Sequence, residues 1–430
     1  MTDQNTPATL EEERRETVAA VIVTFNRVDK LPRTLESVLG QDYPCSTVVV
    51  INNASTDETR EFLDATEDPR IVVRHLQENR GGAGGFEYGM ALGHELGADY
   101  VWVMDDDCYP APDALRILIE QRNAVAETLN KPVPFACSVV KAIDGALCEM
   151  NNPITTWDWP RAFLAGLNSM RVVECTFVSV LFPRYVLSEA GLPLAEYFIW
   201  FDDKEFTKRL SARYAPGIVA MDSIVIHDMG VNAGVNYREV TAANLWKFAS
   251  GARNQSSYRW HFEGSGSYHA YRRRVLDQMR SARVPQSVQR HMREALKSGK
   301  SFAPVPKFPA ELRDDLQLDV GRIADAPPAA IVPQPAVPFA SNAKQVGPQR
   351  KRKSKKQSRL SRLVQRSRRQ PVSPAQLHRL QVRINLLQSE LDEYEAHGKT
   401  LDALVETLEA KLAPVNDALP TNGAASSVSK

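Results

Sequence analysis

The sequence has no run of 18 uninterrupted apolar residues, the length at which a transmembrane helix is expected. Its start, MTDQNTPATLEEERRE, is polar and acidic and lacks the apolar core of a secretory signal. The five cysteines, at positions 45, 108, 137, 148 and 175, include no CxxC pair, which disfavours a zinc ribbon or a redox motif. We therefore expect a cytoplasmic protein with reduced thiols.

Net charge is also almost absent, because 53 basic and 52 acidic residues nearly cancel. The chain does have length and apolar content: its 430 residues are 43% hydrophobic, enough for a large catalytic domain with appendages. Charge is unevenly placed, since residues 350–369 hold 11 Lys or Arg and no acid. Such a segment fits an anionic membrane surface. A solvated linker is the alternative, and nucleic acid is less favoured because the segment has no interleaved aromatic residues.

The first 130 residues alternate β-branched apolar runs with helical stretches, which is typical of a parallel sheet covered by helices. Ligands of such sheets bind at the carboxyl ends of the strands. The predicted strands are 18–25, 46–53, 70–76 and 100–105, and the predicted helices lie near 30–40, 57–65 and 86–96. Further along, 172–182 has the pattern of a strand and 204–210 that of a helix.

Composition divides the chain into segments. We predict a disordered N-terminus (1–17), a catalytic domain (18–235), a helical extension (236–302), a proline-rich linker (303–349), a basic segment (350–370), a coiled coil (373–413) and a disordered tail (414–430). The coiled coil rests on apolar residues at 3-4 spacing from Leu377 to Leu412. It implies self-association, a partner helix, or packing of an ordinary amphipathic helix on the catalytic domain.

Three adjacent aspartates, Asp105, Asp106 and Asp107, end the strand predicted at 100–105. Alternate residues of an extended chain point the same way, so Asp105 and Asp107 can face one point. Two carboxylates with room for water suit Mg²⁺ or Mn²⁺ together with substrate phosphate. A solvated acidic turn is the alternative, but the position at the end of a strand favours the metal.

These motifs resemble a known family. VTFNR, INNAS, NRGGAGGF, the aspartate triplet, and WFDD with a later histidine resemble, in this order, the inverting glycosyltransferases of family 2, which have the GT-A fold. The resemblance covers about residues 18–230. The run from NRGGAGGFEYGM to the triplet is especially similar to actinobacterial galactofuranosyltransferases that begin galactan on a lipid-linked acceptor. It implies an α/β fold with a Rossmann-like, mostly parallel sheet, followed by a C-terminal helical region.

The resemblance also implies residue roles. Asp105, Asp107 and His227 would bind the metal, and Asp203 would take the proton of the acceptor hydroxyl. The residues implied at the donor are Thr24, Asn26, Arg27, Asn52, Asn53, Asn79, Gly81, Gly82 and Asp106, and those at the acceptor are Trp200, Phe201 and Asp202. Many family members carry an acid at the position of Asn52, so the nucleotide base stays open. The structural alternatives are a helix cap for Asp203 and a packed core residue for His227.

The function implied is a metal-dependent transfer of galactofuranose from UDP-galactofuranose to a polyprenyl-diphosphate-linked glycan, in cell-wall biogenesis. The protein would bind the inner face of the cell membrane peripherally, through its basic segment, and the coiled coil would serve as an oligomer contact. Two alternatives remain open. One is a rhamnosyltransferase that uses dTDP-rhamnose, and the other is a non-catalytic membrane or cell-wall scaffold with a degenerate transferase domain.

Overall fold

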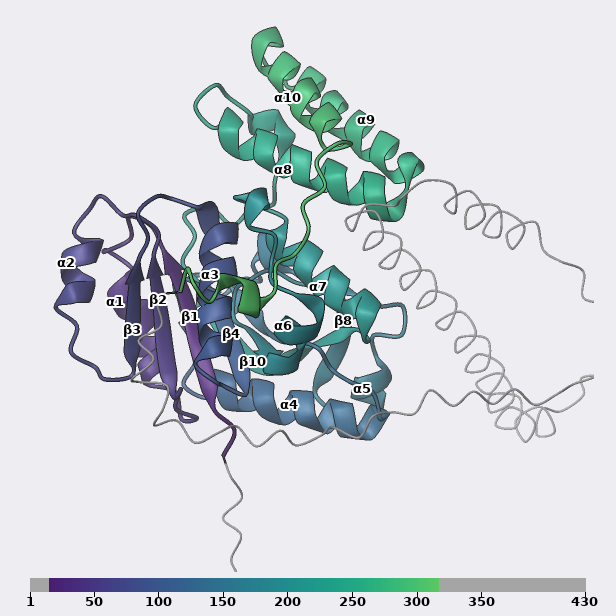
Figure 1. Cartoon of the computed structure of the whole chain (residues 1–430). Helices are drawn as coiled ribbons and strands as arrows, with labels where there is room; N and C mark the ends of the chain where they lie inside the picture. Colours follow the sequence, from purple (N-terminus) through teal and green to yellow (C-terminus); the bar gives the residue numbers. More distant parts are fainter. Residues whose placement is uncertain (1–14, 317–430) are drawn as a thin grey trace, which may run out of the picture. The chain divides into compact units, whose positions relative to one another are not determined.

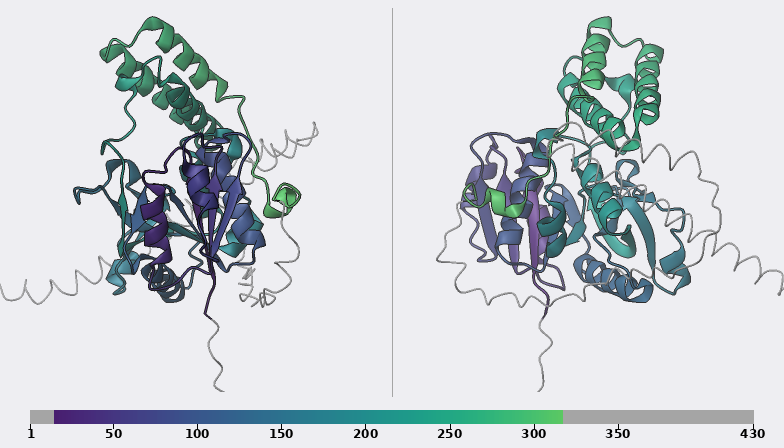
Figure 2. Two further views of the ribbon diagram at one scale, coloured as in Figure 1. Left: turned by 90° about the vertical axis from the view of Figure 1, so that its left-hand side faces the viewer. Right: turned by 45° about the vertical axis from the view of Figure 1, so that its right-hand side comes forward.

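The computed structural model describes residues 15–316, which form a ten-stranded mixed sheet with helices on both faces, followed by a group of helices (Figures 1 and 2). The basic segment, the coiled coil, the tail and most of the predicted linker and N-terminus lie outside the described residues. Within 15–316, no helix has the length and hydropathy needed to cross a bilayer. All five cysteines are free and buried.

The first half of the chain builds the parallel part of the sheet, in the order β3-β2-β1-β4. Its strands are β1 Val18–Thr24, β2 Thr47–Asn52, β3 Ile71–His75 and β4 Tyr100–Asp105. Every residue of β1 is buried, as expected for an apolar run in a sheet covered on both faces. The predicted α/β class and its parallel strands are therefore confirmed.

The second half adds antiparallel pairs and makes the sheet mixed. Its strands are β5 Cys108–Pro110, β6 Ala136–Lys141, β7 Ile154–Thr155, β8 Ser169–Glu174, β9 Val180–Pro183 and β10 Gly217–His227. β9 runs antiparallel to both β4 and β6, and β6 is parallel to β10, so β10 points the same way as β4. The prediction of one strand over 172–182 is wrong: β8 pairs with β10 and β9 with β4, so the chain must leave the sheet between them.

Two apolar cores lie on the two faces of the sheet. Val18, Ala20 and Ile22 pack against α1 Leu31–Leu39 and α4 Ala114–Leu129. Val21 and Val23 pack against the other face, which is covered by α3 Gly81–Glu95, α6 Arg184–Ala190 and α7 Asp202–Arg213 (Figure 1). The remaining short helices before β10 are α2 Thr59–Asp64, η1 Glu149–Asn151, α5 Arg161–Leu164 and η2 Ala195–Tyr197.

The glycine-rich segment is the first part of α3, which begins five residues earlier than predicted. A Cβ on Gly85 would lie 2.4 Å from Cγ1 of Val23, and one on Gly89 would lie 2.5 Å from Cγ1 of Val21. Only glycine therefore lets α3 lie this close to β1. The packing gained outweighs the low helix propensity of glycine, which is why α3 begins before the predicted start of the helix near residue 86.

Three helices with their own apolar core follow the sheet: α8 Leu245–Tyr258, α9 Ser265–Ser281 and α10 Gln286–Ser298 (Figure 2). A short helix, η3 Tyr237–Glu239, precedes them, and a π-helical turn, η4 Arg259–Glu263, joins α8 to α9. The chain then returns to α3 through η5 Pro309–Leu312, where Leu312 and Leu316 are buried. Residues 303–316, assigned from composition to the proline-rich linker, are thus packed where the structure describes them.

Candidate active site

The strand ends bring the predicted residues to one edge of the sheet. Asp105, the last residue of β4, pairs with Val23, and Thr24, the last residue of β1, pairs with Asn52. His227 ends β10, which runs in the same direction as β4. Strands with a common direction place their carboxyl ends on one edge, so the triplet and the histidine meet there although 119 residues separate His227 from Cys108, its partner in β5.

Asp107 and His227 are in direct contact. The Nε2 atom of His227 lies 3.1 Å from Oδ1 of Asp107, and both side chains are buried. On the other side of the ring, Nδ1 lies 2.9 Å from Oδ1 of Asn151, which can only accept. Nδ1 therefore carries the proton, and the Nε2 atom of a neutral imidazole turns its lone pair toward a carboxylate. Such a pair requires a proton or a cation.

The donor set fits a hard divalent cation. In an octahedral complex with ion-to-ligand distances of about 2.1 Å, neighbouring ligand atoms lie about 3 Å apart. The distance between Oδ1 of Asp107 and Nε2 of His227 is close to this value. Cys108 is the third potential donor near these two, and burial raises the pKa of its thiol well above the usual value. A neutral thiol is a poor ligand for Mg²⁺ or Mn²⁺. Asp105, a predicted ligand, does not join this close group within the described residues.

Asp105 nevertheless belongs to the same electrostatic cluster. Burial raises the pKa of its carboxyl well above the usual value, and the charges of Asp107, Asp106, Asp203 and Asp202 raise it further. Burial likewise raises the pKa of Asp106 to about 7. The two halves of the predicted site, the triplet and the WFDD segment, are therefore close enough to influence each other's charge. A buried concentration of carboxylates of this kind favours a cation.

Two basic side chains lie beside the triplet. Nη2 of Arg27 is 3.7 Å from Oδ2 of Asp107, and Nζ of Lys30 is 4.0 Å from the same atom. Lys30 also pairs with Asp228 at 3.3 Å, and Asp228 accepts a hydrogen bond from the hydroxyl of Tyr109 at 2.9 Å. The Arg27 side chain is 43% exposed, so it can turn from the carboxylate to a phosphate at little cost.

The predicted donor-binding asparagines mostly stabilise turns. Oδ1 of Asn26 accepts from the backbone N–H of Thr56 at 2.7 Å, and Asn26 itself has φ +55°. Asn52 contacts Nδ1 of His75 at 2.9 Å and accepts from the N–H of Ser55 at 3.0 Å. These contacts fix the loops after β1 and β2, and a ligand would have to use the remaining hydrogen-bonding capacity.

Asn53 and Asn79 together hold the start of α3. Nδ2 of Asn53 donates to Oδ1 of Asn79 at 3.1 Å and to the carbonyl of Gly81 at 3.0 Å. Gly81 has φ +70°, and a Cβ there would lie 2.0 Å from the carbonyl oxygen of Phe198, so only glycine fits. A Cβ on Gly82 would meet no heavy atom within 4 Å, which leaves this part of the helix N-terminus open to an anion.

The segment before α7 has a strained backbone. Phe198, Trp200 and Phe201 have φ of +64°, +64° and +76°, a region that large side chains rarely adopt. Asn254 of α8 is fully buried and holds this loop, because its Nδ2 donates to the carbonyls of Tyr197, Ile199 and Trp200 at 2.9, 3.1 and 2.9 Å. The helical extension therefore fixes the loop that leads into Asp202 and Asp203 of α7.

The two aromatic residues of WFDD differ in exposure. Phe201 is buried against Tyr258, with ring centroids 5.5 Å apart, so its ring is already covered. Trp200 packs edge-on against Phe248 and lies 4.8 Å below Nζ of Lys247, from α8. Burial lowers the pKa of Lys247, while Asp105 acts to raise it. Lys247 therefore brings a positive charge from the extension toward the triplet.

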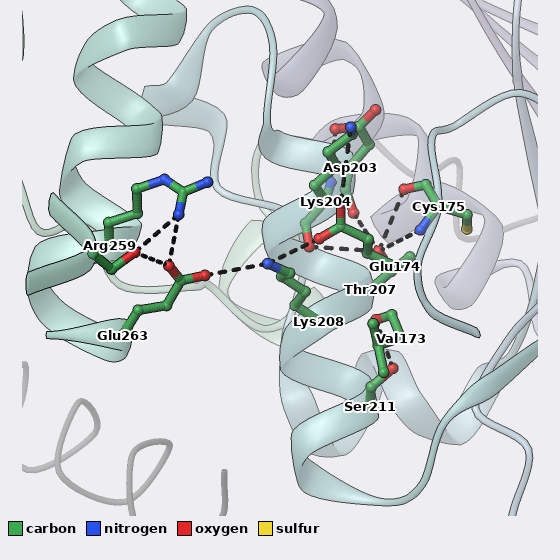
Figure 3. A network of polar contacts seen from close by, with 11 residues as sticks. Val173, Glu174, Cys175, Asp203, Lys204, Thr207, Lys208, Ser211, Arg259 and Glu263 are labelled. Carbon is green, nitrogen blue, oxygen red and sulfur yellow. Dashed lines mark hydrogen bonds and ion pairs between the residues drawn. The ribbon is translucent and has the colours of Figure 1, made fainter. Parts of the chain in front are cut away.

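Asp203 lies in the first turn of α7, at the end of a polar network that joins α7 to β8 and η4 (Figure 3). Its Oδ1 accepts from the backbone N–H of Lys204 at 2.6 Å. Further along α7, Lys208 pairs with Glu174 at 2.9 Å and with Glu263 at 3.4 Å. Burial raises the pKa of both Asp202 and Asp203, as a general base working near neutral pH requires.

Comparison with known proteins gives one family match and several similar sequences. Residues 19–126 match the family described as glycosyl transferase family 2. Over 226 residues the chain is 38% identical to galactofuranosyltransferase GlfT1 of Mycolicibacterium smegmatis, a match that covers 50% of this chain and 72% of that protein. Over 219 residues it is 29% identical to GlfT1 of Mycobacterium tuberculosis, covering 50% of this chain and 71% of that protein.

The chain belongs to glycosyltransferase family 2. Among solved structures, this glycosyltransferase is similar to that of GalNAc-T7 with UDP, GalNAc and Mn²⁺, with a TM-score of 0.46 and 14% identity. The similarity covers 74% of this chain and 59% of that one, less than two thirds of its length.

Three residues of the glycosyltransferase site escaped the sequence prediction: Asn151, Lys247 and Asn254. None lies in a motif, and each reaches the site from an element distant in sequence. Only Asn254 had a signal in the sequence, namely the polar segment NQSSY within a helix that is otherwise amphipathic. Asn and Ser side chains that are buried in a helix need hydrogen-bond partners outside it.

Proposed function

We propose that this family 2 enzyme transfers galactofuranose from UDP-galactofuranose to a polyprenyl-diphosphate-linked cell-envelope glycan, with inversion at the anomeric carbon. The observation that carries the proposal is the convergence of two carboxylate groups, Asp105–Asp107 and Asp202–Asp203, with His227 at one edge of the sheet. Identity to the two galactofuranosyltransferases supports the donor. A nucleotide-sugar donor and a glycan acceptor follow from membership of the family.

Asp203 is the residue we assign as base. Its carboxylate takes the proton of the acceptor hydroxyl while the hydroxyl oxygen forms a bond to the anomeric carbon from the opposite side. The bond from that carbon to the diphosphate breaks, and its electron pair leaves with UDP. Burial raises the pKa of Asp203 to about 6, so its carboxylate is a stronger base than that of an exposed aspartate.

The opposite side of the site receives the leaving group. Asp107 and His227 would hold Mg²⁺ or Mn²⁺, with Asp105 contributing negative charge, and the cation would offset the charge of the departing diphosphate. Arg27 and Lys30 already lie beside these carboxylates and would pair with the phosphate oxygens. Asn151 keeps the ring of His227 oriented through its hydrogen bond to Nδ1.

The acceptor would approach over Trp200, whose ring contacts Lys247 and Phe248 of α8. Because the acceptor is a membrane lipid, we further propose that the enzyme works at the inner face of the cell membrane. Residues 350–369 would supply basic contacts, and residues 373–413 a coiled-coil contact between copies. Both segments lie outside the described residues.

A donor screen tests the proposal. The full chain is incubated with a membrane extract, Mn²⁺ or Mg²⁺, and labelled UDP-galactofuranose, UDP-galactopyranose or dTDP-rhamnose, and lipid-linked products are subjected to linkage analysis. We expect label to enter the lipid fraction only from UDP-galactofuranose, and chelation with EDTA to abolish it. Faster release of dTDP would identify a rhamnosyltransferase. Donor binding without transfer from any donor would favour the scaffold.

A further inference from the structure

A basic hollow lies between α9 and α10, with a volume of about 430 Å³. Five of its lining residues are cationic: Arg272, Arg290, Arg293, Lys297 and Lys300. One carboxylate, Glu294, faces them. None of these residues belongs to the catalytic site, and we call this surface the basic groove. Its volume lies in the range of ligand pockets and exceeds what a single phosphate needs.

Helix periodicity creates the groove. On α10, the spacing of Arg290, Arg293 and Lys297 places all three on one face. Val288, Met292 and Leu296 lie on the other face, buried in the core shared with α8 and α9. Residues 265–300 contain nine Lys or Arg and only two acids, so the surface of this helix pair is strongly positive.

The cations of the groove lack carboxylate partners. Within residues 15–316, none of the five makes an ion pair, whereas Arg280 and Arg259, on the same part of the chain, pair with Asp277 at 2.9 Å and with Glu263 at 2.8 Å. Lys300 instead lies over the rings of Trp260 and Tyr268, at 4.1 and 5.1 Å. Five cations around one hollow repel each other, and an anion bound there would remove that repulsion.

We propose that the basic groove binds the phosphate-bearing headgroups of anionic phospholipids and thereby docks α9 and α10 on the membrane. The inference rests on the proposed function, because a lipid-linked acceptor requires the enzyme to reach a membrane surface. No helix among residues 15–316 can supply that contact by spanning the bilayer. The basic groove can instead make this contact through its charge, because its arginine and lysine side chains are complementary to a membrane surface that carries many phosphates.

The test compares two double variants of the full chain. Arg272→Glu/Lys297→Glu reverses two charges inside the groove, and Arg273→Glu/Arg280→Glu reverses two outside it. Arg273 is exposed and adjacent to Arg272 in sequence, which makes the control closely matched. Binding to phosphatidylcholine vesicles with and without phosphatidylglycerol is measured by co-sedimentation. Hydrogen exchange of residues 265–300 reports the groove separately from the basic segment at 350–369.

We expect that no form of the protein binds vesicles of pure phosphatidylcholine. Each basic side chain near an anionic surface contributes about a factor of five in binding, so the groove variant should bind phosphatidylglycerol vesicles at least about tenfold more weakly than the control. Vesicles should protect 265–300 from exchange in wild type and control but not in the groove variant. The neutral variant Arg272→Gln/Lys297→Gln should show a smaller loss, and melting temperatures show that each form is folded.

Equal vesicle binding and equal protection of 265–300 in both double variants would overturn the proposal. So would protection of 265–300 by inorganic pyrophosphate or single-stranded RNA but not by vesicles. Transfer to a detergent-solubilised acceptor separates this result from the proposed function. The groove variant should retain that activity, whereas loss of transfer in every form, including wild type, would contradict the proposed function and leave the vesicle result intact.

Discussion

Two clusters of buried charge lie on α7, and they differ in whether each negative charge has a positive partner. Glu205 and Arg209 pair at 2.9 Å, and the guanidinium also donates to the carbonyls of Ala190 and Leu192. Asp202 and Asp203, at the start of the same helix, make no ion pair with any residue of 15–316, and burial raises the pKa of both. The first cluster satisfies its own charges. The second is left unbalanced, which is tolerable only where a ligand completes it.

The largest effect should follow from removing the unbalanced charge. Asp203→Asn keeps the shape of the side chain but cannot accept a proton, so we expect kcat to fall by roughly 10³-fold. Thermal stability should stay the same or rise, because a buried carboxylate without a counter-charge is lost. Steady-state kinetics and thermal melting measure the two quantities. Asp277→Asn, on exposed α9, is the control, and unchanged turnover in Asp203→Asn would refute the base assignment.

Removing the cation of the balanced cluster should lower stability and leave activity nearly unchanged. Arg209→Met leaves Glu205 buried without a partner, and we expect the free energy of unfolding to fall by about 3–5 kcal/mol. Activity per folded molecule should remain near that of wild type. Arg213→Met makes the same substitution on an exposed part of the same helix and should cost far less. If Arg209→Met lost turnover before it lost stability, the contrast between the two clusters would fail.

A third variant tests the contact between the extension and the site. Asn254→Ala removes the amide that holds the carbonyls of Tyr197, Ile199 and Trp200. We expect kcat to fall by about 10-fold or more, because a small misplacement of reacting groups is costly. The adjacent substitution Gln255→Ala is the control. A loss of stability alone, with kcat unchanged, would show that the loop keeps its geometry without Asn254.

The smallest effect concerns pH. Burial raises the pKa of Asp106 to about 7, so between about pH 4 and 7 the folded chain holds more protons than the unfolded chain. Its contribution to stability is therefore lost as pH rises through this window. In protein freed of divalent cations, we expect the free energy of unfolding, measured with urea, to fall by about 1–3 kcal/mol as the pH rises through this window. The fall should be smaller in Asp106→Asn. An identical pH slope in the two proteins would contradict this account.

The sequence predicted the site best where chemistry and strand ends coincide. Asp105 and Asp107 could be singled out because they end or follow an apolar run at the edge of a parallel sheet, and His227 because of the family resemblance; the structure places all three at one edge. The turn asparagines were harder to interpret. Asn53 and Asn79 do lie at the same edge, but they contact each other and Gly81, since a side chain that can bind a ligand can equally fix a loop.

Other features could not be predicted because their causes are non-local. The glycines at the start of α3 are poor helix formers, and only the proximity of Val21 and Val23 explains why the helix already begins at Gly81. The same limit applies to Asn254. Its role depends on three carbonyls more than 50 residues away in a loop of unusual backbone conformation, and no periodicity or motif records that pairing.

The amide of Asn254 also indicates which part of the chain an active enzyme must contain. The family match ends at residue 126, and the sheet itself ends with β10. A chain shortened after β10 would retain the aspartate triplet and the aspartates of α7 but would leave the backbone before Asp202 without the support of Asn254. A fusion protein or chimera of this transferase would therefore have to include α8 together with the sheet in order to be active.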